Sequence, residues 1–199
     1  TEPSAAPPTE TTSPAAPVVA SSLDSLASPA LVTFEGAGGY VLHGSYWEGP
    51  PGAPAALLLH QLGADRAEWS PVIVALVEAG FSVLAYDQRG HGASVDAPDG
   101  THRGPRELSA EEWAAYPSDA TAALRGLAAR DAPPRTVVLG GSSVGSSAAL
   151  VAGAEAAEGS VAGIFALSPG RRYRGIDAVA PLAPYEGPVN ADTPDLAAA

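Results

Sequence analysis

The sequence lacks cysteine altogether, which excludes disulfide bonds and metal sites built on thiolates. Basic residues are also scarce: 10 Lys and Arg stand against 22 Asp and Glu, which gives a formal net charge of −12. So acidic a balance disfavours nucleic acid or an anionic membrane surface as a partner. No apolar run is long enough to span a membrane. We interpret the acidic surplus as the solvated surface of a globular protein.

Residues 1–22 differ in composition from the rest of the 199-residue chain. Pro, Ala, Thr, Ser and Glu dominate them, so they cannot bury enough apolar surface to offset the entropy of ordering. We therefore expect a disordered tail over residues 1–22 and one domain over residues 23–199. Such a tail is typical of the tether that follows a cleaved export signal in bacterial surface or periplasmic proteins. This favours export, as a periplasmic or lipoprotein-like surface protein, over the alternative of a cytosolic protein.

Six apolar runs have the length and composition of strands: residues 31–34, 40–47, 55–59, 81–87, 136–139 and 161–167. The first two flank a Gly-rich turn and predict a hairpin. Residues 55–59 are apolar throughout, which is typical of a strand buried on both faces. A helix-like stretch separates them from residues 81–87. This pattern predicts a parallel pair with a right-handed crossover.

Capping signals mark the expected helix boundaries. Ser70 is expected to cap the helix that follows it. Ser109 and Glu112 fit a capping box at the start of a short helix. Pro117 is expected to end that helix and Ser118 to begin the next one.

Residues 141–145 read Gly-Ser-Ser-Val-Gly and fit the pattern G-x-S-x-G, with Ser143 at the centre. A β-branched strand precedes this pattern and a run of small residues compatible with a helix comes after it, which is the context of a nucleophile elbow. Gly141 and Gly145 have no Cβ atom to collide inside so sharp a turn. The alternative is a glycine-rich connector without chemistry. The context favours a nucleophilic Ser143.

Four features of residues 31–169 together resemble the α/β-hydrolase superfamily, with the dienelactone-hydrolase and esterase branch the most similar. They are the leading hairpin, His-Gln-Leu-Gly at residues 60–63, Tyr-Asp-Gln-Arg-Gly-His-Gly-Ala-Ser at residues 86–94, and the pattern around Ser143. The second occupies the family's oxyanion loop and the third is close to its D-x-R-G-H-G-x-S segment. The resemblance implies an α/β fold with a mostly parallel sheet of about six strands, helices on both faces, and the last strands missing or degenerate.

The same resemblance implies acyl-transfer chemistry on a small-molecule ester or amide. Ser143 Oγ is expected to attack the carbonyl, and the backbone N–H groups of Val144 and Leu62 are expected to bind the oxyanion. No metal and no organic cofactor are required. The polar residues of segment 86–94 are expected to shape the turn after their strand rather than to catalyse. The sequence does not indicate the substrate or the oligomeric state.

The acid and the base of the family are harder to find. The family order is Ser, then Asp or Glu, then His, but all histidines precede Ser143: His43, His60, His91 and His102. Of these, His43 is expected on a strand face and His60 in the oxyanion loop. Candidates for the acid, by position alone, are Asp177, Asp192 and Asp195. His102 as a replacement base is a further idea, although nothing in the sequence places it beside Ser143.

Two explanations fit this pattern. The chain is a piece, or an altered C-terminus, of a longer hydrolase, or it is a complete but degenerate relative. Residues 185–189 look like the start of a seventh strand that then stops, which favours the first explanation. We therefore expect a serine esterase that is weak or inactive as the chain stands. The alternative is a non-catalytic binding domain of the α/β-hydrolase type.

Overall fold

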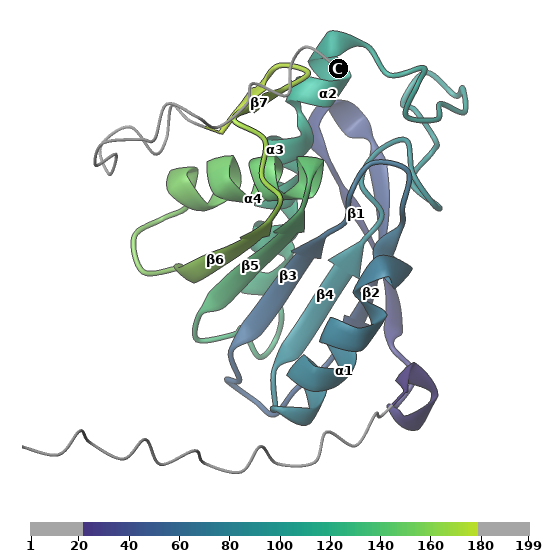
Figure 1. The fold of residues 1–199 in the computed structure, drawn as a ribbon. Helices are drawn as coiled ribbons and strands as arrows, with labels where there is room; N and C mark the ends of the chain where they lie inside the picture. Colours follow the sequence, from purple (N-terminus) through teal and green to yellow (C-terminus); the bar gives the residue numbers. More distant parts are fainter. Residues whose placement is uncertain (1–21, 179–199) are drawn as a thin grey trace, which may run out of the picture.

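The computed structural model of the protein describes residues 22–178, and a six-stranded sheet lies at its centre (Figure 1). The strands are β1 (Ala30–Glu35), β2 (Val41–Trp47), β3 (Ala55–Leu59), β4 (Ser82–Tyr86), β5 (Val137–Ser142) and β6 (Val161–Leu167). They follow the order β1-β2-β4-β3-β5-β6 across the sheet. β1 and β2 form the predicted antiparallel hairpin, and β2 is antiparallel to β4. The remaining neighbours are parallel.

The centre of the sheet is β3, which is fully buried along its whole length. Its last residue, Leu59, lies opposite Tyr86 of β4 on one side and Gly141 of β5 on the other. The carboxyl ends of the three strands are therefore adjacent, and the loops that leave them meet at one edge of the sheet. Because the chain runs from β3 to one neighbour and later returns on the other side, this edge is a topological switch point, where open α/β sheets bind ligands.

Helices cover both faces of the sheet. α1 (Ser70–Glu78) packs on one face, in a core with Leu58 and Val83. α3 (Tyr116–Ala128) and α4 (Val144–Glu155) pack on the other face, in a core with Leu57 and Leu139 (Figure 1). Neighbouring residues of β3 thus point into opposite cores, as the pleat of a strand requires. The predicted α/β fold, with a mostly parallel sheet between helices, is confirmed. Within residues 22–178 no helix has the length and apolarity to cross a membrane.

Beyond β6 the chain forms a two-stranded hairpin of β7 (Arg172–Tyr173) and β8 (Ile176–Asp177), which the sequence did not predict. It contacts α4 and lies above the end of the sheet in Figure 1. The predicted tail at residues 1–22, apart from Ser22, lies outside the described residues. So does the segment 185–189.

Two helix boundaries differ from the prediction. Ser70 is the first residue of α1 rather than its cap, because a 3-10 helix over Arg66–Trp69 already precedes it. Asp65 caps this 3-10 helix by accepting a hydrogen bond from Ala67 N at 2.8 Å. Pro117 does not end a helix. It lies in the first turn of α3, which begins at Tyr116, because a first-turn residue needs no N–H donor.

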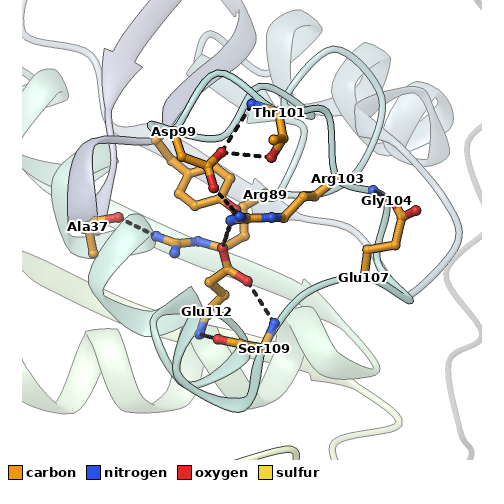
Figure 2. A network of polar contacts seen from close by, with 10 residues as sticks. Ala37, Arg89, Asp99, Thr101, Arg103, Gly104, Glu107, Ser109 and Glu112 are labelled. Carbon is orange, nitrogen blue, oxygen red and sulfur yellow. Dashed lines mark hydrogen bonds and ion pairs between the residues drawn. The ribbon is translucent and has the colours of Figure 1, made fainter.

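The capping box of α2 (Ala110–Ala114) is confirmed and is part of a wider polar network (Figure 2). Ser109 Oγ accepts from Glu112 N at 3.2 Å, and Ser109 N donates to Glu112 Oε2 at 2.7 Å. The other carboxylate oxygen of Glu112 pairs with Arg103 Nη1 at 2.6 Å. Arg103 also pairs with Asp99, which accepts from the backbone and the hydroxyl of Thr101. The network fixes the irregular loop before α2 to the start of that helix.

A buried ion pair joins three distant parts of the chain. Arg89 Nε and Nη2 donate to the two carboxylate oxygens of Asp119 at 2.6 and 2.5 Å, and both side chains are at most 2% exposed. Arg89 Nη2 also donates to Ala37 O at 2.8 Å, and Asp119 Oδ1 accepts from Ala37 N at 2.9 Å. The loop after β4, helix α3 and the turn between β1 and β2 are thereby held together.

We predict that Asp119→Asn lowers the free energy of unfolding by about 3–5 kcal/mol, because it leaves the guanidinium of Arg89 buried without a negative partner. Urea unfolding monitored by circular dichroism measures this loss. Asp131→Asn, at an exposed carboxylate after α3, is the matched control and is expected within about 0.5 kcal/mol of the wild type. A loss below about 1 kcal/mol for Asp119→Asn would contradict the prediction.

Candidate active site

Ser143 lies at the turn between β5 and α4, at the edge of the sheet where the loops meet. Its backbone has φ 49° and ψ −115°, a strained conformation for a residue with a side chain, at a cost of about 1–3 kcal/mol. Ser143 N donates to Leu167 O at the end of β6 at 2.8 Å, which holds the turn in place. The side chain is half-buried. This is the strand-turn-helix geometry that the sequence predicted for residues 141–145.

The two glycines of the motif leave no room for a side chain. A Cβ atom on Gly141 would lie 2.5 Å from Gly145 O, and one on Gly145 would lie 2.6 Å from His60 O and closer still to Leu59 O. The first turn of α4 therefore packs directly on the backbone at the end of β3. The role predicted for both glycines is confirmed.

Ser146 is a structural residue of the turn that the sequence pattern did not reveal. Its buried Oγ lies 2.7 Å from Gly141 O and 2.9 Å from Leu167 O, so it links the end of β5 to the end of β6. Ser147 Oγ donates to Gly170 O at 3.0 Å. The sequence signal for this role was the pair of serines, Ser146 and Ser147, in an otherwise largely apolar helix, because buried hydroxyls need hydrogen-bond partners.

The predicted oxyanion loop, residues 60–63, lies beside the turn because Leu59 and Gly141 are neighbours in the sheet. Gln61 N donates to Glu68 Oε2 at 2.8 Å, and Gly63 N donates to His91 Nε2 at 3.1 Å. The amide of Leu62 between them donates to no acceptor within residues 22–178, and neither does the amide of Val144 at the start of α4. Both predicted donors are thus available at this edge.

His60 is fully buried and has a partner on each ring nitrogen. Nδ1 donates to Gln61 O at 2.7 Å, and Nε2 accepts from Gln88 N at 2.9 Å. Gln88 Nε2 in turn donates to His60 O at 2.5 Å. Burial lowers the pKa of His60 below its ordinary value. His60 is therefore bound to the backbone within the predicted oxyanion loop and to that of Gln88.

Segment 86–94 is structural, as predicted. Asp87 accepts from Arg66 N at 2.9 Å, from Arg66 Nη1 at 2.6 Å and from Ala93 N at 2.8 Å. Arg89 is committed to the buried ion pair with Asp119. His91 accepts from Gly63 N and donates from Nδ1 to Arg89 O at 3.1 Å. Asp87, Arg89 and His91 are each at least 96% buried.

The other histidines and the acid candidates do not complete a triad in the described residues. His43 is half-buried on β2, and His102 is 80% exposed and pairs with Asp96 at 2.5 Å. None of the four histidines, all within residues 22–178, contacts Ser143 Oγ through a hydrogen bond. Asp177 Oδ2 lies 3.1 Å from Arg172 Nε. Asp192 and Asp195 lie outside the described residues.

The sequence around this site matches a known protein family. The model of the family described as serine aminopeptidase S33 matches residues 53–185, which include both the oxyanion loop and Ser143. The chain belongs to this family of α/β hydrolases. The S33 match begins just before β3 and therefore covers the parallel part of the sheet.

Curated relatives match the S33 chain over short segments. It is 48% identical to epoxide hydrolase A of Mycobacterium tuberculosis over 46 residues, and this match covers 23% of this chain and 14% of that protein. It is 44% identical to 3-oxoadipate enol-lactonase 1 of Acinetobacter baylyi over 46 residues, and this match covers 23% of this chain and 17% of that protein. The matches thus span less than a fifth of these relatives.

Solved structures share the fold over a longer stretch. The esterase Pf2001 of Pyrococcus furiosus superposes with a TM-score of 0.57 at 23% identity, over 71% of this chain and 50% of that one. The esterase RhEst1 of a Rhodococcus species superposes with a TM-score of 0.54 at 22% identity, over 70% of this chain and 46% of that one. The S33 chain therefore spans about half the length of these esterases and has their fold.

We predict that Gly145→Ala lowers the free energy of unfolding by about 1–3 kcal/mol, because the added methyl group must push α4 away from the backbone of β3. Gly126→Ala is the matched control. Gly126 lies in helix α3 with open space around it, so an alanine there is expected to stabilise the protein by about 0.5–1 kcal/mol. Urea unfolding of both variants measures the difference, and equal effects would contradict the close packing at Gly145.

Proposed function

We propose that this S33 chain has the site of a serine hydrolase of the esterase type, with Ser143 as nucleophile. One observation carries the proposal. A serine with φ 49° stands at the carboxyl end of a central parallel strand, between two glycines that admit no side chain. Strain of this kind persists only where the surrounding structure imposes it, and it is concentrated at functional sites.

In the proposed reaction, Ser143 Oγ attacks the carbonyl carbon of an ester while the carbonyl oxygen becomes an oxyanion. The amides of Leu62 and Val144 are the donors proposed for this oxyanion, and Val144 also begins helix α4, whose N-terminus favours negative charge. Loss of one such donor costs about 3–4 kcal/mol in the transition state. Collapse of the intermediate breaks the bond to the alcohol oxygen, the alcohol leaves with the proton that the Ser143 hydroxyl lost, and an acyl group stays on Ser143. Water then attacks the acyl group, which releases the carboxylic acid and returns a proton to Ser143 Oγ.

One of the two curated relatives named above supports an ester as the substrate class, whereas the other is an epoxide hydrolase. The enol-lactonase acts on a lactone by its name, and a lactone is an internal ester. The esterases with the same fold point in the same direction. We therefore propose a small-molecule ester as substrate. Export of the protein stays a prediction from the composition of residues 1–22.

A non-catalytic binding domain is the second candidate function. It is favoured by the histidines, because His60 and His91 are both occupied by backbone partners and His102 pairs with Asp96. A serine without a base is a poor nucleophile. Covalent labelling of the serine and ester turnover separate the two candidates.

We predict that a fluorophosphonate probe labels Ser143 in the folded protein, slowly because no histidine within residues 22–178 hydrogen-bonds to it, and that Ser143→Ala abolishes the labelling. Such probes react at serines activated by their site, so the signal reports nucleophilicity directly. Ser160→Ala, at an exposed serine before β6, is the matched control and is expected to label as the wild type does. Absence of label on a protein with a folded circular-dichroism spectrum would favour the binding domain.

We predict that the chain hydrolyses p-nitrophenyl acetate poorly, because no histidine within residues 22–178 hydrogen-bonds to Ser143. Release of p-nitrophenol, compared with Ser143→Ala and with buffer, measures the rate. Fast turnover that Ser143→Ala abolishes would show that a base reaches Ser143, and would overturn the prediction of weak activity while supporting the nucleophile.

A further inference from the structure

Two buried imidazoles, His60 and His91, form hydrogen bonds with the backbone of the proposed oxyanion loop, residues 60–63. Their rings lie edge to face with centroids 5.0 Å apart. Each ring has one backbone N–H and one backbone carbonyl as partners: Gln88 N and Gln61 O for His60, Gly63 N and Arg89 O for His91. An N–H group can only donate and a carbonyl can only accept. Each Nε2 must therefore carry a lone pair and each Nδ1 a proton, so both rings are neutral.

We propose that His91 is a positioning residue for the oxyanion loop, and that a proton on His91 releases the loop and switches the site off in acid. The inference rests on the proposed function of that loop. A protonated His91 would present Nε2–H to the N–H of Gly63, so that an attractive contact becomes a repulsive one.

The placement of the bonds explains why one proton has this effect. Leu62 N is the proposed oxyanion donor, and the amides on either side of it are both bound: Gln61 N to Glu68 and Gly63 N to His91. Gly63 has φ +76°, the left-handed region that a glycine adopts at least cost. The loop therefore keeps its shape through these two bonds. A protonated Glu68 carboxyl would still have an oxygen that accepts, whereas a protonated Nε2 of His91 can only donate, so the Gly63 bond is the one that a single proton abolishes.

Burial opposes the protonation of His91 and is the largest influence, so the pKa of His91 lies below the ordinary value. The backbone of Arg89 and of Gln88, and then the Asp87 carboxylate after β4, act in the opposite direction and raise this pKa. Asp87 is itself bound by Arg66. The hydroxyl of Tyr116 from α3 lies 3.5 Å from His91 Nδ1 and is neutral, because burial raises its pKa. The ring of Trp113 from α2 lies edge to face with the ring of His91, with the ring centroids 6.5 Å apart.

His60 completes the surroundings of His91. Burial lowers the pKa of His60 too, and the hydrogen bond to Gln61 O acts against it. A charge on His91 would lower the pKa of His60 further, whereas Asp87 and Glu68 raise it. Both folded-state pKa values thus lie below the ordinary value of 6.5. As the pH falls below 6.5, the unfolded chain binds protons at these histidines that the folded protein excludes, so the free energy of unfolding decreases. The decrease ends once the pH is below the folded-state pKa of each histidine. Well above pH 6.5, these two residues contribute no pH dependence.

The test measures amide hydrogen exchange at Gly63 by NMR, as a protection factor corrected for intrinsic rates, together with the rate of fluorophosphonate labelling between pH 4.5 and 8. We expect both to fall together in acid in the wild-type protein. His91→Leu removes the acceptor and is expected to lower Gly63 protection roughly tenfold at every pH. His91→Gln places an amide oxygen near the position of Nε2, so protection and labelling are expected to persist in acid until the whole fold opens.

His102→Gln is the matched control, because His102 is an exposed imidazole that pairs with Asp96, and it is expected to keep the wild-type profile. Gly63 protection that does not change with pH, or a His91→Gln variant with the wild-type acid loss, overturns the proposal. If His91→Leu fails to fold, the wild-type and His91→Gln profiles decide. If Ser143 is labelled at neutral pH but Gly63 protection does not change with pH, the proposed function stands and the role of His91 is overturned. If Gly63 protection falls in acid but Ser143 is never labelled, the His91 contact is supported and the proposed hydrolase function is overturned.

Discussion

The contact between the first turn of α4 and the backbone of β3 is the constraint on which the site depends. Gly145 allows the helix to lie against the carbonyl groups of Leu59 and His60, and Gly141 allows the chain to turn sharply enough to reach that position. Ser143, in the turn between these two close contacts, has a positive φ. The strain at the serine is therefore balanced by packing in the central layer of the fold.

Much of the fold could be predicted because buried strands have a simple signature. An unbroken apolar run such as residues 55–59 satisfies burial on both faces, and the G-x-S-x-G pattern defines the turn and the helix start after β5. Helix ends were less predictable. Ser70 has the chemistry of a cap, but Asp65 caps an earlier 3-10 turn, and which of two suitable residues acts depends on the path of the preceding loop.

The candidate site was predictable as far as its local pattern extends. Ser143 and its glycines belong to one short motif, whereas the support of the oxyanion loop comes from residues far apart in the sequence. Gly63 meets His91 across 28 positions, and nothing in the chain between them signals that contact. The use of an imidazole as an acceptor for a backbone amide depends on burial and orientation, which only the tertiary structure defines.

The ion pair of Arg89 and Asp119 bears on how the domain comes apart. The peptide at Ala37 both donates to the pair and accepts from it, so the first hairpin is tied to α3 by charge as well as by the sheet. Peeling the hairpin away would break both hydrogen bonds between the Ala37 backbone and the charged pair, and hydrogen bonds to charged groups are stronger than those between neutral groups. The amino-terminal strands are thus part of the same cooperative unit as the helices behind the serine, and partial opening from that end is suppressed.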